Sequence, residues 1–576
     1  MISSKTPRTG RFFRLLPLAL SALGGIFALG GWLAPNHYPP WTSFHGEACA
    51  FASLGLFCLA VVVKDRHTVN FPLASWFMLG LVGLIWLQWR FGLIASFGDA
   101  FLSSLYLCGF ALSLWLGRQT RARALRDSAP RLVSALFITA AVISVYIALL
   151  QWLRLESLWG IFATERGPEM RPFGNLGQPN HLATLVLMAC PLTALLLVRG
   201  DIKPWQFWTV LAALSIGLAL SESRSGRLSA LFIGLYLLWI ARTRRLPAIT
   251  RTVFLWWVLI AGVWFIRDYA TDFLLLQPGR EVHMTQDQAR TVMWTQMVAA
   301  IREAPWFGYG WRQTIVAQKT GALAQSGLLV TDYAHNIELD VLLWVGLPLG
   351  LILIGVAVWW LIRLADNSKT LDQALIFASV IPFLIHSQFE FPFAYAYFLF
   401  PVGWALGFLG SFRTNTFVVP QQTIIARFGV PAFIVAYIMF CVFAGRDYLL
   451  AEEDYRVMRF ELRKVGQRPS DYVAPDLHWL TQLNDLLLAG RIKPRAGMPQ
   501  AEIQLLGRVN QSQGWAMLHL SYIAALGMNG QEERASAELR RLRALYGDVT
   551  YGQAVQHLKD MQRDEAFAPL RRISIP

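Results

Sequence analysis

The run LVSALFITAAVISVYIALLQW at residues 132–152 decides the fold class, because it contains no charged residue and is long enough to cross a bilayer as a helix. Arg131 precedes the run and Arg154 follows it, so that basic side chains mark both ends. A helix in the core of a soluble protein needs only one apolar face, whereas this run is apolar all round. It therefore predicts a membrane-spanning helix.

Comparable apolar runs recur along the 576 residues, and 55% of all residues are hydrophobic while only 15% are charged. Such a composition excludes a cytosolic enzyme, a disordered chain and a fibrous one. The prediction is an all-α polytopic membrane protein with about 13 transmembrane helices. The candidate spans lie near residues 15–34, 48–63, 71–89, 99–117, 132–152, 181–198, 205–221, 228–240, 252–267, 338–362, 372–386, 395–410 and 425–445.

The positions of the basic residues account for much of the net charge of +15. With thirteen spans, the basic clusters fall on the same side as the N-terminus, which is the cytoplasmic side by the positive-inside rule. This topology accounts for the positive charge, so no nucleic-acid partner is expected. Membrane lipids are expected to be partners of the protein. The largest clusters are Lys5, Arg8, Arg11 and Arg14, then Arg118, Arg121, Arg123, Arg126 and Arg131, and finally Arg242, Arg244, Arg245 and Arg251.

An odd number of spans places the long connection 268–337 and the tail 446–576 outside the cytoplasm. We expect a membrane domain at 1–445 and a small helical domain at 446–576, where apolar residues recur at helical spacing. Gly527, Asn529 and Gly530 are expected to break two of the tail's helices. The pair is similar to one tetratricopeptide hairpin, although no 34-residue repeat follows. Function is expected on the external face, because the long connections lie there.

The external segment RPFGNLGQPNH at 171–181 leads directly into a predicted span. Pro, Gly and amide side chains shape the backbone at a helix start, where free N–H groups favour anions. Arg171 is suited to hold a phosphate through its planar guanidinium group. The alternative is that Arg171 snorkels to the interface and Asn180 caps the helix. Upstream, His37 and His45 flank a Pro-rich turn, where a role in bracing the loop is favoured.

Other external polar residues lie beside predicted span ends. SESRSGR at 221–227 places arginines against the charge bias, which indicates an anionic partner such as a lipid headgroup or a lipid-linked diphosphate. His335 precedes a helix start and is a candidate general base. Near 386–397, Glu390, Tyr395 and Tyr397 either assist chemistry or anchor the interface. No carboxylate or cysteine spacing indicates a metal site, and no cofactor is expected.

Four motifs together resemble the bacterial pilin O-oligosaccharyltransferases (PglL-like), within the superfamily of O-antigen ligases and polymerases. The motifs are NHYPPW at 36–41, RPFGNLGQPNHLA at 171–183, SRSGR at 223–227 and AHNIEL at 334–339. The last two are typical of the whole superfamily, whereas the first two favour the protein-modifying branch.

The resemblance implies a GT-C-like inner-membrane glycosyltransferase whose active site faces the periplasm. It would transfer an oligosaccharide from undecaprenyl diphosphate to Ser or Thr of a periplasmic protein such as a type IV pilin. The resemblance implies catalytic roles for His335, Gln178, Arg290 and Tyr397, although the spacing does not decide between Tyr397 and Tyr395. Arg171, Arg224 and Arg290 would bind the donor diphosphate, and Asn180, His181 and Tyr395 would orient the substrate.

Three alternatives remain. An O-antigen ligase would use lipid A core as acceptor, and an O-antigen polymerase would extend another glycan. A lipid-linked glycan flippase would need a polar path across the bilayer, and charged residues are nearly absent from the middles of the predicted spans.

Overall fold

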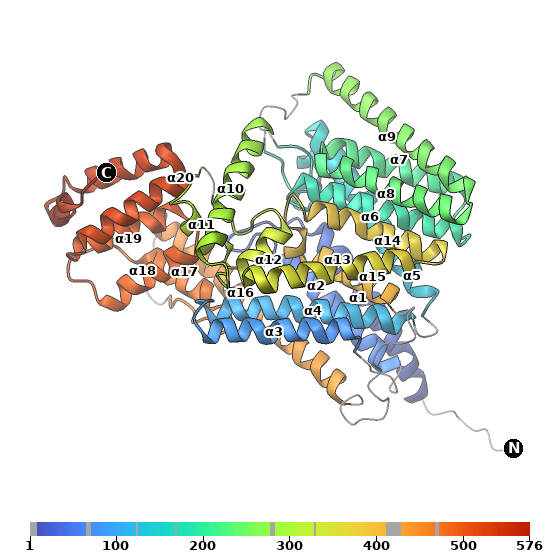
Figure 1. Cartoon of the computed structure of the whole chain (residues 1–576), viewed down its shortest axis with the longest axis horizontal. Coiled ribbons are helices and arrows are strands. Elements are labelled where there is room, and N and C mark those ends of the chain that lie inside the picture. The colour runs from blue at the N-terminus through green and yellow to red at the C-terminus, as the bar shows by residue number, and fades with distance from the viewer. Residues whose placement is uncertain are drawn as a thin grey trace. The chain divides into compact units, whose positions relative to one another are not determined.

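The computed structural model describes residues 9–64, 71–121, 125–167, 170–276, 283–327, 330–410, 428–466 and 472–575. Every regular element within these ranges is helical, which confirms the predicted all-α class (Figure 1). Lys5, Arg8, Arg66, Arg123, Arg413 and the start of the predicted span 425–445 lie outside the described residues.

The chain divides into two compact units. Unit 1 comprises Met1–Leu81, Leu105–Arg280 and Val358–Val442, and unit 2 comprises Val82–Ser104, Glu281–Ala357 and Phe443–Pro576. Four helices have residues in both units: α3 (Leu73–Arg90), α4 (Phe97–Arg121), α13 (Leu347–Asn367) and α16 (Val430–Leu462).

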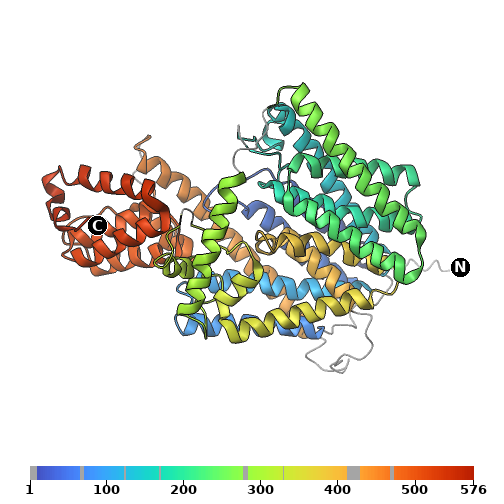
Figure 2. The same cartoon turned by 45° about the horizontal axis from the view of Figure 1, so that its top comes forward.

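Helix α6 (Pro179–Val198) forms the core of unit 1 and is buried nearly all round. Leu182 and Leu185 have no exposed surface, and a helix that is apolar on every side needs such an interior position. It packs against α5 (Ser128–Leu153), α7 (Pro204–Ser221), α8 (Arg224–Arg244) and α14 (Leu371–His386). Figures 1 and 2 show these helices lying side by side in both views.

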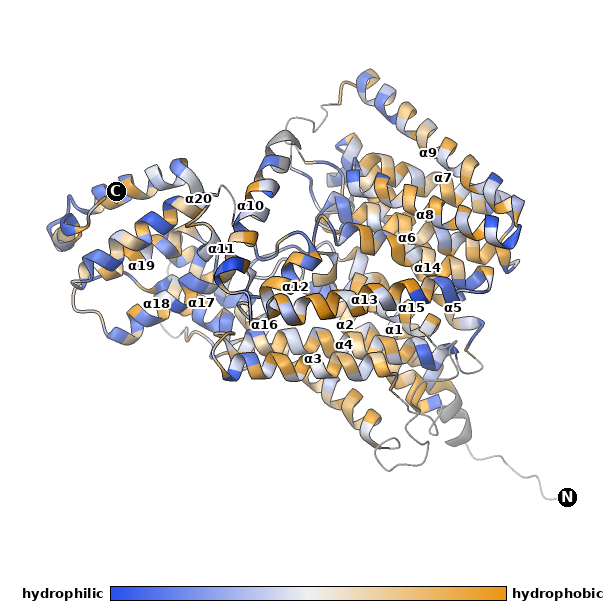
Figure 3. Ribbon diagram, in the orientation of Figure 1, coloured by the Kyte–Doolittle hydropathy of each residue, from blue (hydrophilic) through white to orange (hydrophobic). Residues whose placement is uncertain are grey.

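The remaining helices of unit 1 complete a membrane bundle. They are α1 (Thr9–Leu33), α2 (Phe44–Lys64), α9 (Pro247–Phe273) and α15 (Ala396–Gly410), with short 3-10 turns at η1 (Glu156–Phe162) and η2 (Pro392–Ala394). Phe254 and Phe265 of α9 are 64% and 75% exposed, as expected where lipid rather than water covers the surface. Figure 3 shows hydrophobic residues along these helices, whereas the tail is mixed. The chain is a multi-pass membrane protein.

Ten helices of the described residues are long and apolar enough to span a membrane. Three more apolar helices, α14, α15 and α19 (Ala516–Met528), are shorter, and α8, which carries arginines at both ends, is not among the ten. Helices lie at the positions of all the predicted spans. The count of thirteen spans stays a prediction.

The predicted span 338–362 is wrong as a single helix, because α12 (Ile337–Val345) and α13 are separated at Gly346. Gly346 has a φ of 79°, and a Cβ atom there would lie 2.4 Å from the carbonyl oxygen of Trp306. The segment 305–310 crosses at this break, where the Tyr309 amide donates to the Leu343 carbonyl at 2.7 Å. Only glycine allows this approach.

Unit 2 also contains α10 (His283–Glu303), α11 (Thr314–Gly321) and the tail helices. The tail comprises α17 (Thr481–Arg491), α18 (Gln500–Ser512), α19 (Ala516–Met528), α20 (Glu532–Met561) and η4 (Glu565–Arg572). Gly527 lies inside α19 rather than breaking it, and Gly530, with a φ of 74°, makes the turn. Helix α16 runs without a break across residue 445, the predicted boundary between the membrane domain and the tail. The division into these two domains stays a prediction.

The tail contacts α11 through Lys319. Its ammonium group donates to the carbonyl oxygens of Asn510 and, at 3.0 Å, of Gln513, at the end of α18. Burial lowers the pKa of Lys319 to about 8. Within unit 2 the tail therefore packs against α11, which lies in the connection between α10 and α12.

Candidate functional site

The loop 171–178 is held in place by one buried amide, that of Gln151 on α5. Its Oε1 accepts hydrogen bonds from the amides of Phe173 and Gly174, both at 2.9 Å. Its Nε2 donates to the carbonyl oxygens of Gly174 at 2.7 Å and Thr164 at 2.9 Å. Gln151 has no exposed surface, so these four bonds fix a polar loop against an apolar helix.

Asn175 fixes the same loop to neighbouring segments. Its side chain donates to the carbonyl oxygens of Leu33 and Phe162 at 2.9 and 2.8 Å, and it accepts from the Thr164 amide at 3.0 Å. His37 Nε2 lies 2.9 Å from the carbonyl oxygen of Asn175. This contact agrees with the loop-bracing interpretation of His37.

Three candidate residues follow this loop at the start of α6. Gln178 is the N-cap residue, Pro179 begins the helix, and Asn180 and His181 belong to its first turn. The alternative interpretation of Asn180 as the helix cap is wrong, because Asn180 lies inside the helix. Gln178 and Asn180 are half-buried, whereas His181 is only 1% exposed.

His181 packs in an aromatic cluster from η2 and α15. Its Nδ1 lies 3.3 Å from the hydroxyl group of Tyr397, and its ring centroid is 4.5 Å from that of Tyr395. Tyr397 is 6% exposed, whereas Tyr395 is half-buried. Beside them, Glu47 accepts from the Ala396 amide at 2.8 Å, which anchors the start of α15. Of the two tyrosines, Tyr395 is therefore the more accessible.

The SRSG segment forms the turn between α7 and α8. Ser223 is the N-cap of α8 and accepts from the Gly226 amide at 3.0 Å. A Cβ atom on Gly226 would lie 2.9 Å from the Cβ atom of Ala183, so the turn packs against the first turns of α6. Small residues are required on this inner side. Arg224, the first residue of α8, is exposed.

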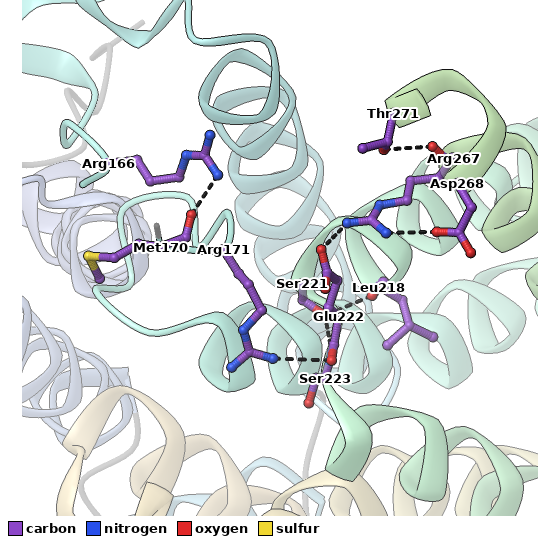
Figure 4. Close-up of polar contacts among 10 residues, drawn as sticks. All are labelled: Arg166, Met170, Arg171, Leu218, Ser221, Glu222, Ser223, Arg267, Asp268 and Thr271. Carbon is purple, nitrogen blue, oxygen red and sulfur yellow. Dashed lines mark hydrogen bonds and ion pairs between the residues drawn. The ribbon is translucent and has the colours of Figure 1, made fainter. Parts of the chain in front are cut away.

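Two arginines hold Glu222, the residue before this turn (Figure 4). Arg171 Nη1 donates to the backbone carbonyl oxygen of Glu222 at 3.1 Å. The Glu222 carboxylate pairs with Arg267 of α9, and the side chains of this ion pair are only 13% and 12% exposed. Arg267 also contacts the exposed Asp268 at 2.7 Å. The structure therefore places Arg171 next to the turn that carries Arg224.

The candidates of unit 2 lie on α10 and on the loop before α12. Arg290 and Trp294 lie one turn apart on α10. His335 has a φ of 53° and immediately precedes Asn336, the N-cap of α12, whose side chain accepts from the Leu339 amide at 2.9 Å. Non-glycine residues seldom adopt this left-handed conformation.

Tyr333 and Ala334, the two residues just before His335, are buried, and a cation lies beside Tyr333. The guanidinium group of Arg312 lies 5.8 Å from the ring centroid of Tyr333. Among the residues described in either unit, no three His, Cys, Asp or Glu side chains gather in a way that would hold a metal ion.

The structure thus groups the candidate residues into two sets. Unit 1 holds Arg171 beside the Arg224 turn, with Gln178, Asn180, His181, Tyr395 and Tyr397 at the start of α6 and its aromatic cluster. Unit 2 holds Arg290 and His335.

Comparison with known proteins bears on both sets. Residues 209–354 match the O-antigen ligase family, and residues 374–559 match the C-terminal part of the virulence factor membrane-bound polymerases. Residues 172–197, which contain the Gln178 loop, match the protein glycosylation ligase family. The general O-oligosaccharyltransferase of Acinetobacter baylyi is 29% identical over 96% of both chains. The chain is therefore similar over nearly its whole length to an O-oligosaccharyltransferase, and parts of it match the O-antigen ligases and the protein glycosylation ligases.

A second oligosaccharyltransferase, the ComP-specific O-oligosaccharyltransferase of the same organism, is 29% identical over 68% of this chain and 71% of its own length. The predicted resemblance to these enzymes is therefore confirmed, and this similarity assigns the chain as a glycosyltransferase. The individual site residues stay predictions.

No role was predicted from the sequence for several polar residues that hold the two sets of candidate residues in place. Gln151 and Glu47 lie within predicted spans or next to them, where a lone polar residue was a recognisable signal. Arg267 and Asp340 also lie near the ends of predicted spans, but nothing in the sequence indicated Glu222 and Thr314 as their partners.

Proposed function

We propose that this oligosaccharyltransferase transfers an oligosaccharide en bloc from an undecaprenyl-diphosphate carrier to Ser or Thr of a periplasmic protein such as a type IV pilin. The match of the Gln178 loop to the protein glycosylation ligases carries this proposal. The enzyme would lie in the bacterial inner membrane, with its active site facing the periplasm, because the basic connections mark the cytoplasmic side.

The chemistry requires stabilisation of a leaving group and activation of a nucleophile. The acceptor hydroxyl oxygen forms a bond to the anomeric carbon of the glycan, and the bond from that carbon to the diphosphate oxygen breaks. Negative charge then develops on the diphosphate, which Arg224, Arg171 and Arg290 would stabilise. The proton of the hydroxyl group would pass to His335 as general base.

The residues at the start of α6 would orient the substrate. Gln178 and Asn180 offer side-chain amide groups at the start of α6, and such groups suit phosphate or sugar oxygens. His181 is buried, so that its contribution would act through the two tyrosines that contact it. Of those two, the half-buried Tyr395 is better placed to meet a substrate than Tyr397.

The direct test combines purified enzyme, lipid-linked oligosaccharide and candidate pilin, with mass spectrometry of the product. We expect the intact glycan on a Ser or Thr of the pilin. In this assay His335→Ala should leave the protein inserted and abolish transfer, whereas His557→Ala, an exposed tail residue, should transfer normally. Near-normal transfer by His335→Ala would defeat the assignment of the base.

The match of residues 209–354 to the O-antigen ligases favours one second candidate, a ligase that uses lipid A core as acceptor. A deletion strain separates the two. Loss of pilin glycosylation supports protein transfer, and loss of only the lipopolysaccharide O-antigen supports the ligase.

A further inference from the structure

The residue before His335 is held on both sides by side chains from two different helices. The indole Nε1 of Trp294 on α10 donates to the carbonyl oxygen of Ala334 at 2.8 Å. The amide of Ala334 donates to Oδ1 of Asp340 on α12 at 2.9 Å. Ala334 has no exposed surface, so that water cannot replace either bond. Both backbone groups of Ala334 are thereby fixed.

The conformation of His335 needs such support. A φ of 53° is unfavourable for a residue with a Cβ atom, and such a residue keeps this conformation where its surroundings over-determine it. Asn336 fixes the backbone on the far side as the N-cap of α12, and Ala334 fixes it on the near side. The backbone conformation of His335 is therefore supported from both sides, by the two bonds to Ala334 and by the Asn336 cap.

Asp340 is itself held rigidly. Its Oδ1 also accepts from the hydroxyl group of Thr314 at 2.7 Å, and that hydroxyl oxygen accepts from the indole of Trp344 at 2.8 Å. Asp340 and Thr314 have no exposed surface. Burial raises the pKa of Asp340 to about 7, although the bonds that it accepts oppose this rise. A buried carboxyl group whose partners are fixed in this way holds the Ala334 amide in a defined position.

Trp294 also relates His335 to Arg290. Residues four apart on a helix share a face, so Arg290 lies next to Trp294 on α10. The bond from Trp294 to Ala334 therefore sets the position of the Arg290 helix relative to the His335 loop, both within unit 2.

We propose that Trp294 and Asp340 are positioning residues that hold Ala334 from both sides and so aim His335 at the acceptor hydroxyl group. This role rests on the proposed function of His335 as general base. The clamp itself does not, because it is a property of the loop that can be measured without substrate.

The experiment compares Trp294→Phe with Trp404→Phe in the purified full-length enzyme. Trp404 is also buried and donates a comparable indole bond, to Thr120 at 3.1 Å, but in unit 1. Hydrogen–deuterium exchange reports on residues 331–337, and kcat and KM are measured with lipid-linked oligosaccharide and pilin. For Trp294→Phe we expect faster exchange in this loop and a fall in kcat of about tenfold or more, with KM for the acceptor unchanged. Trp404→Phe should show neither effect.

A second pair of variants, at Asp340, distinguishes a positioning role from a general loss of folding. Asp340→Asn keeps an oxygen that can accept from Ala334 and Thr314, whereas Asp340→Ala keeps none. We expect Asp340→Asn to retain most of the kcat that Asp340→Ala loses.

Each outcome tests one part of the proposal. Unchanged exchange in both Trp294→Phe and Asp340→Ala overturns the clamp. Faster exchange with kcat within about twofold of wild type, while His335→Ala is inactive, overturns the positioning role. An active His335→Ala variant instead overturns the proposed base, and exchange alone then decides whether the clamp exists.

Discussion

Arg171 donates a hydrogen bond to the backbone carbonyl oxygen of Glu222, fifty-one residues along the chain, at 3.1 Å. This bond ties the loop before α6 to the turn before α8. Arg171 therefore has a structural task in addition to any contact with the donor, whereas Arg224 is exposed at the first residue of α8. The two arginines should respond differently to substitution.

Arg224→Lys should weaken binding of the lipid-linked donor, because lysine keeps the charge but loses the planar fork that bonds two phosphate oxygens. We expect KM for the donor to rise about tenfold, from the loss of one charge-assisted bond. Steady-state kinetics with purified enzyme measure this. The matched control is Arg227→Lys, since Arg227 is also exposed and lies over the ring of Trp264 at 4.9 Å. If Arg224→Lys binds the donor as tightly as Arg227→Lys does, Arg224 does not bind the diphosphate.

Glu222→Gln should destabilise the enzyme, because it removes the charge that pairs with the mostly buried Arg267. Removal of one partner of a buried ion pair costs about 3 kcal/mol, since the other charge stays desolvated. Thermal unfolding in detergent should show a lower midpoint temperature. Asp268→Asn is the control, because this second partner of Arg267 is 56% exposed and should contribute little. Equal shifts in the two variants would show that the Glu222 pair is not the stronger one.

The membrane fold was predictable from the sequence, because uninterrupted apolar runs such as 132–152 have one stable structure in a bilayer. The N-cap was harder to place. Asn180 has a good capping side chain, yet Gln178 occupies the N-cap, because Pro179 fits the first helical position best. Local preference for a residue type therefore did not determine the register.

Contacts between distant segments were outside the reach of sequence reasoning. The bond from Trp294 to Ala334 spans forty residues, and nothing in either segment indicates the other. The division of 338–362 at Gly346 has the same origin, because the crossing segment 305–310, and not the local apolar pattern, interrupts the helix.

Gly346→Ala should displace this crossing segment. The new Cβ atom would meet the carbonyl oxygen of Trp306 at 2.4 Å in a left-handed backbone conformation, so we expect a loss of more than about 1 kcal/mol of stability. Gly355→Ala is the matched control on α13, where a Cβ atom meets nothing within 4 Å and alanine favours the helix. Midpoint temperatures of the two variants test this, and a Gly346→Ala enzyme as stable as Gly355→Ala would contradict it.

Acid should destabilise the tail through His519 of α19. This side chain is 1% exposed, and its Nε2 lies 2.9 Å from the carboxylate of Glu538. Burial lowers the pKa of His519 below the value of 6.5 expected in the unfolded chain, although Glu538 opposes the shift. The unfolded chain therefore binds more protons below that pH, and the stability present above pH 6.5 falls as the pH drops further.

Proteinase K cleavage within residues 481–575 of the full-length enzyme, followed against temperature between about pH 5.5 and 8, measures this dependence. The midpoint temperature for cleavage should fall on the acid side in the wild type. His519→Gln removes the titrating group, so its midpoint should vary less with pH, whereas His478→Gln should behave as wild type because His478 is 69% exposed. A His519→Gln variant with the full wild-type pH dependence would assign the acid sensitivity to another group.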